Sequence, residues 1–159
     1  MSEVLSNPGV VRVRAALDAA GIASAIVELP GAARTARAAA EFLGCDVGQI
    51  ANSLVFRAQT SGSAVLVMSS GARRVDTGRL GLLIEEPVEK ASAGFVRERT
   101  GFAIGGVAPV GHGLRALVEK SLAVHHTLWA AAGHPHTVFP LTYAELLRIT
   151  RGTEVEVAQ

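Results

Sequence analysis

Short helix-like and strand-like segments alternate along the whole chain, and only short connections separate them. A parallel pair of strands that follow each other in sequence needs a crossover of about a dozen residues or more, usually containing a helix. The connections here are too short for a regular series of such units. The pattern therefore predicts an α+β fold, in which helices pack outside a mostly antiparallel or mixed sheet, and it leaves open that this sheet curls into a barrel.

Capping residues and glycines mark the ends of the predicted helices. The first helix begins after Asn7 and is closed by Gly21, and Thr142 with Glu145 forms a capping box for the last one. The predicted helices cover residues 8–20, 36–43, 77–83, 93–100 and 143–149, and the predicted strands cover residues 22–29, 53–58, 64–69, 88–91, 115–118, 127–131, 137–140 and 154–157. A Ser-Gly turn at 61–62 joins two of these strands into a hairpin.

Composition limits the class of protein. The chain has 159 residues, which fits one domain over 1–159, and 49% hydrophobic against 18% charged residues excludes disorder as the main state. The net charge of +1, without a helix-turn-helix or a basic-aromatic pattern, argues against sequence-specific DNA binding and a polybasic membrane surface. The lone Cys45 cannot form an internal disulfide, and neither a secretory leader nor a long apolar run is recognisable. We expect a cytoplasmic protein with no membrane partner.

The segment from Gly105 to Gly113 holds four glycines and Pro109 within nine residues. Glycine lets the backbone turn sharply and approach a ligand closely, and proline stiffens the turn. Adjacent main-chain N–H groups in such a loop can hold a carboxylate, a phosphate or a developing oxyanion. A plain surface turn is the alternative. The segment does not match the glycine-rich phosphate-binding motifs G-x-G-x-x-G and G-x-x-x-x-G-K-[ST], so it does not indicate nucleotide binding.

His134 is a second candidate, because it stands in a tight turn between Gly133 and a proline. An imidazole in such a turn can orient a water or an ester, and an exposed loop histidine is the alternative. His125, His126 and His136 add further imidazoles, but their spacing does not match a known metal site. We expect neither a metal nor a cofactor.

Arginines precede and follow the hairpin. Arg34 and Arg37 lie before and within the second helix, and Arg73 and Arg74 follow the hairpin. Their guanidinium groups can contact the phosphates of a large anionic substrate, whereas a solvated charged face or an internal Arg–Asp pair is the alternative. Asn52 is a polar residue among apolar ones at a strand start, where it is otherwise read as a turn residue. No G-x-S-x-G elbow occurs, so a Ser–His–Asp hydrolase is not indicated.

Taken in order, several segments resemble one known family. They are Thr35 with Ala39-Ala40, the segments 49–56, 74–76, 100–102, 105–109 and 133–135, and Thr142 with 145–147. This ordered set, above all the G-x-x-x-P loop at 105–109, is similar to the YbaK/ProX family of aminoacyl-tRNA deacylases, which is related to the editing insertion domain of bacterial prolyl-tRNA synthetases. The resemblance spans roughly residues 20 to 157.

The resemblance implies a curled, mostly antiparallel sheet with flanking helices, and hydrolysis of the ester that joins a wrong amino acid to the 3′ end of tRNA. The implied partner is aminoacylated tRNA, with an aminoacyl-tRNA synthetase as a further one. The residues implied as catalytic are Asn52, Gly105, Gly106 and His134, and those implied to bind substrate are Thr35, Ser70, Arg74, Val107, Ala108, Pro109, Gly111 and Gly133. The loop is then expected to donate N–H groups to the ester carbonyl as negative charge develops on it.

One position departs from the family pattern. Many members carry a lysine where this chain has Asn52, and an amide offers hydrogen bonds but no charge. Two interpretations follow. In the first, the protein is a deacylase for a different aminoacyl group, and its Ala- and Val-rich walls suit small amino acids such as alanine, serine, threonine or cysteine. In the second, it binds aminoacyl-tRNA or a synthetase without turnover.

Overall fold

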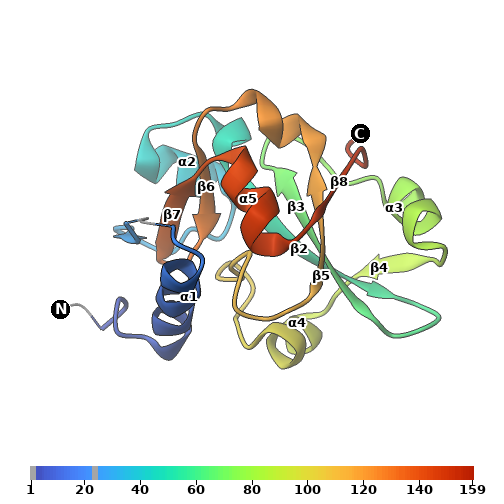
Figure 1. The fold of residues 1–159 in the computed structure, drawn as a ribbon, viewed down its shortest axis with the longest axis horizontal. Coiled ribbons are helices and arrows are strands. Elements are labelled where there is room, and N and C mark those ends of the chain that lie inside the picture. Colours follow the sequence, from blue (N-terminus) through green and yellow to red (C-terminus); the bar gives the residue numbers. More distant parts are fainter. Residues whose placement is uncertain (1–2, 23–24) are drawn as a thin grey trace.

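Two β-sheets form the frame of the molecule (Figure 1). The computed structural model describes residues 3–22 and 25–159. Its elements are, in chain order, α1 (Pro8–Ala19), β1 (Val27–Glu28), α2 (Ala36–Leu43), the 3₁₀ helix η1 (Val47–Gln49), β2 (Ala51–Ala58), β3 (Ala64–Ser70), α3 (Thr77–Ile84), β4 (Val88–Lys90), α4 (Ala93–Thr100), β5 (Arg115–Glu119), the 3₁₀ helix η2 (Lys120–Val124), β6 (Leu128–Ala131), β7 (Thr137–Leu141), α5 (Tyr143–Thr150) and β8 (Thr153–Val155). The predicted α+β class is confirmed.

The larger sheet has the strand order β4-β2-β3-β5-β8, and the smaller one has the order β1-β7-β6. Strand β2 pairs antiparallel with β3 and β4, and every pair in the smaller sheet is antiparallel. A single bridge between Ile50 and Trp129 joins the two sheets. The described strands therefore do not close into a barrel, so that option was wrong, whereas the mostly antiparallel arrangement is confirmed.

Two strand pairs are parallel, because β5 runs parallel to both β3 and β8. The chain between β3 and β5 passes through α3, β4 and α4, and the chain between β5 and β8 passes through β6, β7 and α5. These long paths supply the crossovers that parallel pairing requires. Parallel neighbours therefore come from segments far apart in the sequence, and not from consecutive strands.

The predicted helix ends are held by side-chain caps. Thr35 Oγ1 accepts a hydrogen bond from the Ala38 N–H at 3.1 Å. At α5, Thr142 Oγ1 accepts from the Glu145 N–H at 3.1 Å, and Glu145 Oε1 accepts from the Thr142 N–H at 2.9 Å. The helix η2 was not predicted. The strand expected over 22–29 is observed only as Val27–Glu28, and residues 23 and 24 of that prediction lie outside the described residues.

Strand β3 is buried on both faces, which explains its unbroken apolar run. On one face Leu66 and Met68 pack in the main core, together with Leu17 of α1. On the other face Val65 and Val67 pack against Leu80 of α3. Side chains of a strand alternate between its two faces, so a strand covered on both sides reads as continuous apolar sequence and not as an alternation.

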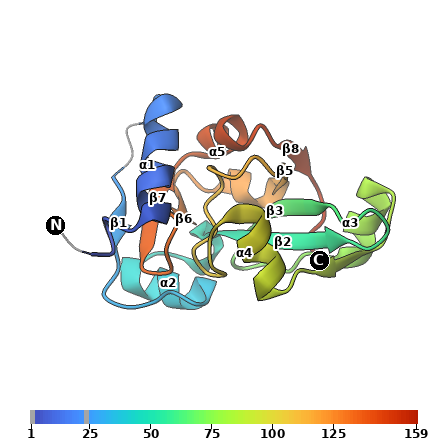
Figure 2. The same cartoon turned by 90° about the horizontal axis from the view of Figure 1, so that it is seen from below.

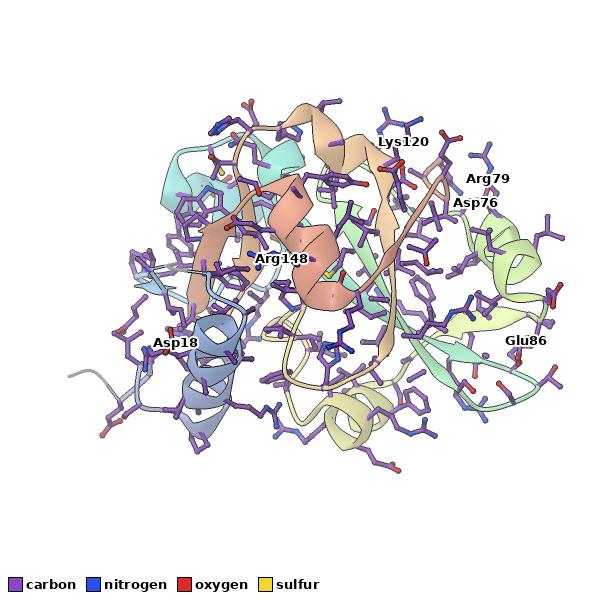
Figure 3. All side chains as sticks on the ribbon, viewed as in Figure 1. Asp18, Asp76, Arg79, Glu86, Lys120 and Arg148 are labelled. Carbon is purple, nitrogen blue, oxygen red and sulfur yellow. The ribbon has the colours of Figure 1, made fainter. Side chains whose placement is uncertain are left out.

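Helix α1 lies at one end of the molecule beside β1 and β7, whereas α3 lies at the opposite end (Figures 1 and 2). Arg148 of α5 donates a hydrogen bond to the Ala20 carbonyl just after α1, at 2.8 Å between Nη1 and the oxygen (Figure 3). The C-terminal helix thus fastens the end of the N-terminal one. None of the described helices has the length and apolar character that crossing a membrane requires.

Candidate functional site

One cavity of the described structure has a volume of about 790 Å³. It lies at the N-terminal half of β2, where the two sheets separate. Strand β4 pairs with β2 only from Phe56 onward, and Ile50 is bridged to Trp129 of the smaller sheet. Residues 51–55 between these two points line the cavity, together with α2, the turn after β3 and the glycine-rich loop. Strand β3 pairs with one edge of β2 here, but no described strand pairs with the other edge at residues 51–55, and this leaves room for a ligand.

Five cations line this cavity, and no Asp or Glu is among its described lining residues. They come from α2 and the segment before it, from the turn after β3 and from β4, and they are Arg34, Arg37, Arg73, Arg74 and Lys90. All five are exposed, and none of their side chains has a hydrogen-bond or ion-pair partner among the described residues. The chain as a whole carries only +1, so this lining of five cations without a carboxylate is far more positive than the chain average.

Asn52 lines the same cavity from β2. The hydroxyl side chains of the lining are occupied: Thr35 Oγ1 caps α2, Ser53 Oγ donates to the Met68 sulfur at 3.4 Å, and Thr137 Oγ1 donates to the His134 carbonyl at 2.8 Å. The Asn52 amide has no hydrogen-bond partner among the described residues. It is therefore free to donate to, or accept from, a molecule in the cavity.

The glycine-rich loop contributes main-chain groups. Gly105, with φ +91°, and Val107 line the cavity, and no described residue accepts a hydrogen bond from either N–H. The N–H of Gly106, in contrast, already donates to the Ala103 carbonyl at 2.9 Å. Two amides of the loop, those of Gly105 and Val107, thus have free donors, and Gly106 serves the turn itself.

Gly106 is also the point at which the loop rests on the segment that contains His134. A Cβ at Gly106 would lie 2.9 Å from both the Cα and the N of His134. On the other side of that segment, a Cβ at Gly133 (φ +101°) would lie 2.6 Å from the Gly9 carbonyl oxygen in α1. Three stretches of backbone are therefore stacked, and only glycine allows them to come so close.

The His134 side chain is not among the lining residues of the cavity. Its Nδ1 accepts a hydrogen bond from the His136 N–H at 3.0 Å, and the two rings meet edge to face with centroids 5.2 Å apart. Burial and the neighbouring His136 lower the pKa of His134, while Glu28 opposes them. The structure thus places the His134 ring in the turn beside β1, and Pro135 instead reaches the cavity.

The remaining predicted residues divide into two groups. Thr35 and Arg74 lie in the cavity wall, whereas Ala108, Pro109 and Gly111 do not. Ser70 faces a second hollow of about 690 Å³ on the other side of the turn after β3. Its Oγ donates to the Gly48 carbonyl at 3.0 Å and accepts from the Ala72 N–H at 3.2 Å, so Ser70 shapes this turn.

The lining residues that the sequence analysis missed include Lys90 and Trp129. The only signal for Lys90 was its place in a short strand, because nothing in the sequence shows that β4 runs to the mouth of the cavity. No group of three or more His, Cys, Asp or Glu side chains that could hold a metal ion occurs within residues 3–22 and 25–159.

Comparison with known proteins agrees with this geometry. Residues 31–149 match the model of the aminoacyl-tRNA editing domain. A Bacillus subtilis protein described only as the uncharacterized protein YwhH is 29% identical over 123 residues, which cover 76% of this chain and 78% of that one. A solved structure proposed to be a trans-editing enzyme for prolyl-tRNA synthetase is 41% identical, with a TM-score of 0.89, and covers 96% of this chain and 98% of that one.

A second solved structure, described in work on epitope backbone grafting for presenting linear epitopes on scaffold proteins, is 38% identical with a TM-score of 0.90. It covers 96% of this chain and 99% of that one. The family model covers well over half of the sequence and includes every segment that lines the cavity. The chain belongs to the aminoacyl-tRNA editing domain family.

Proposed function

We propose that this protein hydrolyses the ester between a small amino acid and the 3′ end of a mischarged tRNA, acting in trans on tRNA released by a synthetase. The observation that carries the proposal is the set of five unpaired cations around a cavity whose lining includes the unpartnered Asn52 amide and two residues, Gly105 and Val107, whose N–H groups have no acceptor among the described residues. The last nucleotides of a tRNA bring several phosphates next to one neutral ester. The cavity offers the complementary arrangement, with charge at the mouth and neutral donors inside.

In this proposal the cations bind the terminal phosphates, and the N–H groups of Gly105 and Val107 receive the carbonyl oxygen of the ester. Water adds to the carbonyl carbon, the bond to the ribose oxygen breaks, and that oxygen leaves with a proton. Negative charge develops on the carbonyl oxygen in the transition state, where loss of one such donor typically costs about 10²–10³ in rate. Asn52 orients the water or the neighbouring ribose hydroxyl.

The nature of the walls supports a small amino acid. Alanines and valines recur in the lining near α2 and β2, including Ala36, Ala39, Ala51 and Val55. These residues provide a smooth apolar surface for a side chain such as that of alanine, serine, threonine or cysteine. Because one methylene changes binding by only about 1–3 kcal/mol, such a wall separates similar amino acids incompletely. The proposal places the protein in the cytoplasm, where aminoacyl-tRNA is made, with tRNA and, in a handover step, a synthetase as partners.

A deacylation screen tests the proposal. Purified protein is incubated with a panel of tRNAs charged with small amino acids, and ester loss is followed against buffer. We expect turnover of at least one member. Asn52→Ala should lower kcat/KM about tenfold, the value of one hydrogen bond. Gln59→Ala, which removes an exposed amide away from the cavity, is the matched control and should change little. Ester loss no faster than in buffer for every substrate would exclude the enzyme.

A second function is favoured by one feature, the neutral Asn52 where many relatives carry a lysine. The cavity would then bind an aminoacyl-adenosine end without turnover. Tight binding of a non-hydrolysable aminoacyl-adenosine, with no loss of ester from any tRNA, would support this function. Gain of hydrolysis in Asn52→Lys would identify the missing charge as the reason.

A further inference from the structure

The loop that lines the cavity is held from behind by His112. Its Nε2 lies 2.8 Å from the Ala108 carbonyl oxygen, and its Nδ1 accepts a hydrogen bond from the Leu114 N–H at 3.1 Å. A main-chain N–H can only donate, so Nδ1 must be unprotonated and the ring proton sits on Nε2. Neutral His112 therefore joins both ends of the turn over 108–114 through one ring.

The ring has aromatic and charged neighbours that belong to other elements. Phe102 meets it edge to face, with centroids 6.3 Å apart and planes at 84°. The Arg12 guanidinium of α1 stacks on Phe102 at 4.1 Å from its centroid and donates to the Thr100 carbonyl at 2.8 Å. Arg12 is the charged group that acts on His112 among the described residues. Burial and this charge lower the pKa of His112, while its bond to Ala108 opposes them.

We propose that neutral His112 is a positioning residue for the reaction, because its two hydrogen bonds tie the Ala108 carbonyl to Leu114 and so restrict the backbone just after Val107, whose N–H lies two peptide groups before that carbonyl. The inference rests on the proposed function. Ala108 and Pro109 are buried and line no part of the cavity, so the Ala108 carbonyl is held on the far side of the loop from the ligand. A donor that must meet a developing charge loses much of its effect when it is displaced by a fraction of a bond length.

Protonation breaks this arrangement in a defined way. A second proton goes to Nδ1, which then can no longer accept from the Leu114 N–H. Activity is therefore expected above the pKa of His112 and is lost as the pH falls through it, below the ordinary histidine value of about 6.5. Arg12→Met removes the neighbouring positive charge, so it should raise the pKa of His112 and move the acidic limb of the pH–rate profile to higher pH.

Three substitutions separate the two hydrogen bonds. His112→Gln places a donor near the Nε2 position, His112→Asn places an acceptor near the Nδ1 position, and His112→Phe keeps the ring but removes both bonds. We expect His112→Phe to lower kcat about tenfold to a hundredfold with KM nearly unchanged, and His112→Gln to recover part of that loss. All three variants should lack the acidic limb that belongs to His112. His126→Phe removes an exposed imidazole and is the control.

NMR tests the two hydrogen bonds of His112 in the absence of substrate. We expect the wild-type ¹⁵N shifts of His112 to show the tautomer protonated at Nε2, and the Leu114 and Val107 amide signals to move with the titration of His112. Unresponsive amides, the opposite tautomer, or a His112→Phe variant with wild-type kcat and pH profile would overturn the inference. If the amide signals move with His112 but the protein hydrolyses no tRNA ester, the proposed function is refuted, and with it the role of His112 in the reaction. The two hydrogen bonds of His112 would still be supported. Thermal melts show whether each variant is folded.

Discussion

The structure contains two hollows of similar size and opposite character. The first, of about 790 Å³, is lined by five unpaired cations, whereas in the second, of about 690 Å³, the charged side chains other than Arg73, which lines both hollows, have partners. There Lys120 pairs with Glu156 at 3.2 Å, and Arg79 donates to the Ala158 carbonyl at 2.9 Å and lies near Asp76 (Figure 3). Volume alone would not separate the two. The unpaired cations distinguish the first hollow as the one whose charge suits an anionic ligand.

The buried Glu119 explains what the second hollow does instead. Its Oε1 accepts from the Ser121 N–H at 3.2 Å, and its Oε2 accepts from the N–H groups of Val157 and Ala158 at 2.6 and 3.0 Å. A carboxylate with this many donors is satisfied by the protein itself. The contacts of Glu119 therefore hold the C-terminal segment against β5 and η2 beside the second hollow. Three predictions test the contrast between this structural hollow and the first cavity.

The largest effect is expected from Gly106→Ala. The new methyl group would lie within 3.0 Å of His134 backbone atoms, so the loop must move away from the segment beneath it. A displacement near 1 Å costs about 10² in rate, and we expect kcat/KM for deacylation to fall by at least that factor. Gly94→Ala in α4 is the control, because nothing lies within 4 Å of its Cβ. Equal activity of the two variants would show that the loop is not part of the site.

A smaller effect is expected from the cations. The double variant Arg37→Gln with Arg74→Gln should raise KM about tenfold and make log KM less steep against log salt, by about 0.7 per lost phosphate contact. The control is Arg57→Gln with Lys120→Gln, which removes the same charge from paired positions outside the first cavity. A similar rise in both doubles would mean that net charge, and not its placement, draws the substrate in.

The smallest effect on catalysis is expected from Glu119→Ala. This change leaves three N–H groups, two of them buried, without their acceptor and should lower the free energy of unfolding by roughly 2–4 kcal/mol. Because Glu119 lines only the second hollow, kcat/KM at 25 °C should stay within about twofold of wild type. Denaturant titration and the deacylation assay on the same preparation compare the two quantities. A large loss of kcat/KM in folded protein would show that the contacts of Glu119 influence the first cavity.

Much of the local structure was predictable because its causes are local. The capping box of Thr142 with Glu145 is read from residues three apart, and it occurs as predicted. Arg34, Arg37, Arg73 and Arg74 line one cavity, so their grouping agrees with the option of a shared anionic ligand, while the phosphate contact itself stays a prediction.

The rest depends on contacts that distant segments make. Parallel pairing of β3, β5 and β8 is decided by packing across long connections, so short connections alone pointed too strongly to antiparallel neighbours. The same holds for Lys90, whose position follows from the register that sets it opposite Phe56 of β2. His134 was chosen for its type and its turn, and sequence gives no information on which side of a turn an imidazole points.

The stacking of Gly9 on Gly133 has a consequence for anyone who would move this site to another protein. Helix α1 lies before residue 31, outside the segment that matches the family model, yet it supports the floor beneath the loop and carries Arg12. A fragment limited to residues 31–149 would contain every residue that lines the cavity but would lack helix α1, on which the segment with Gly133 rests. Transplants of this domain should include the first turns of the chain.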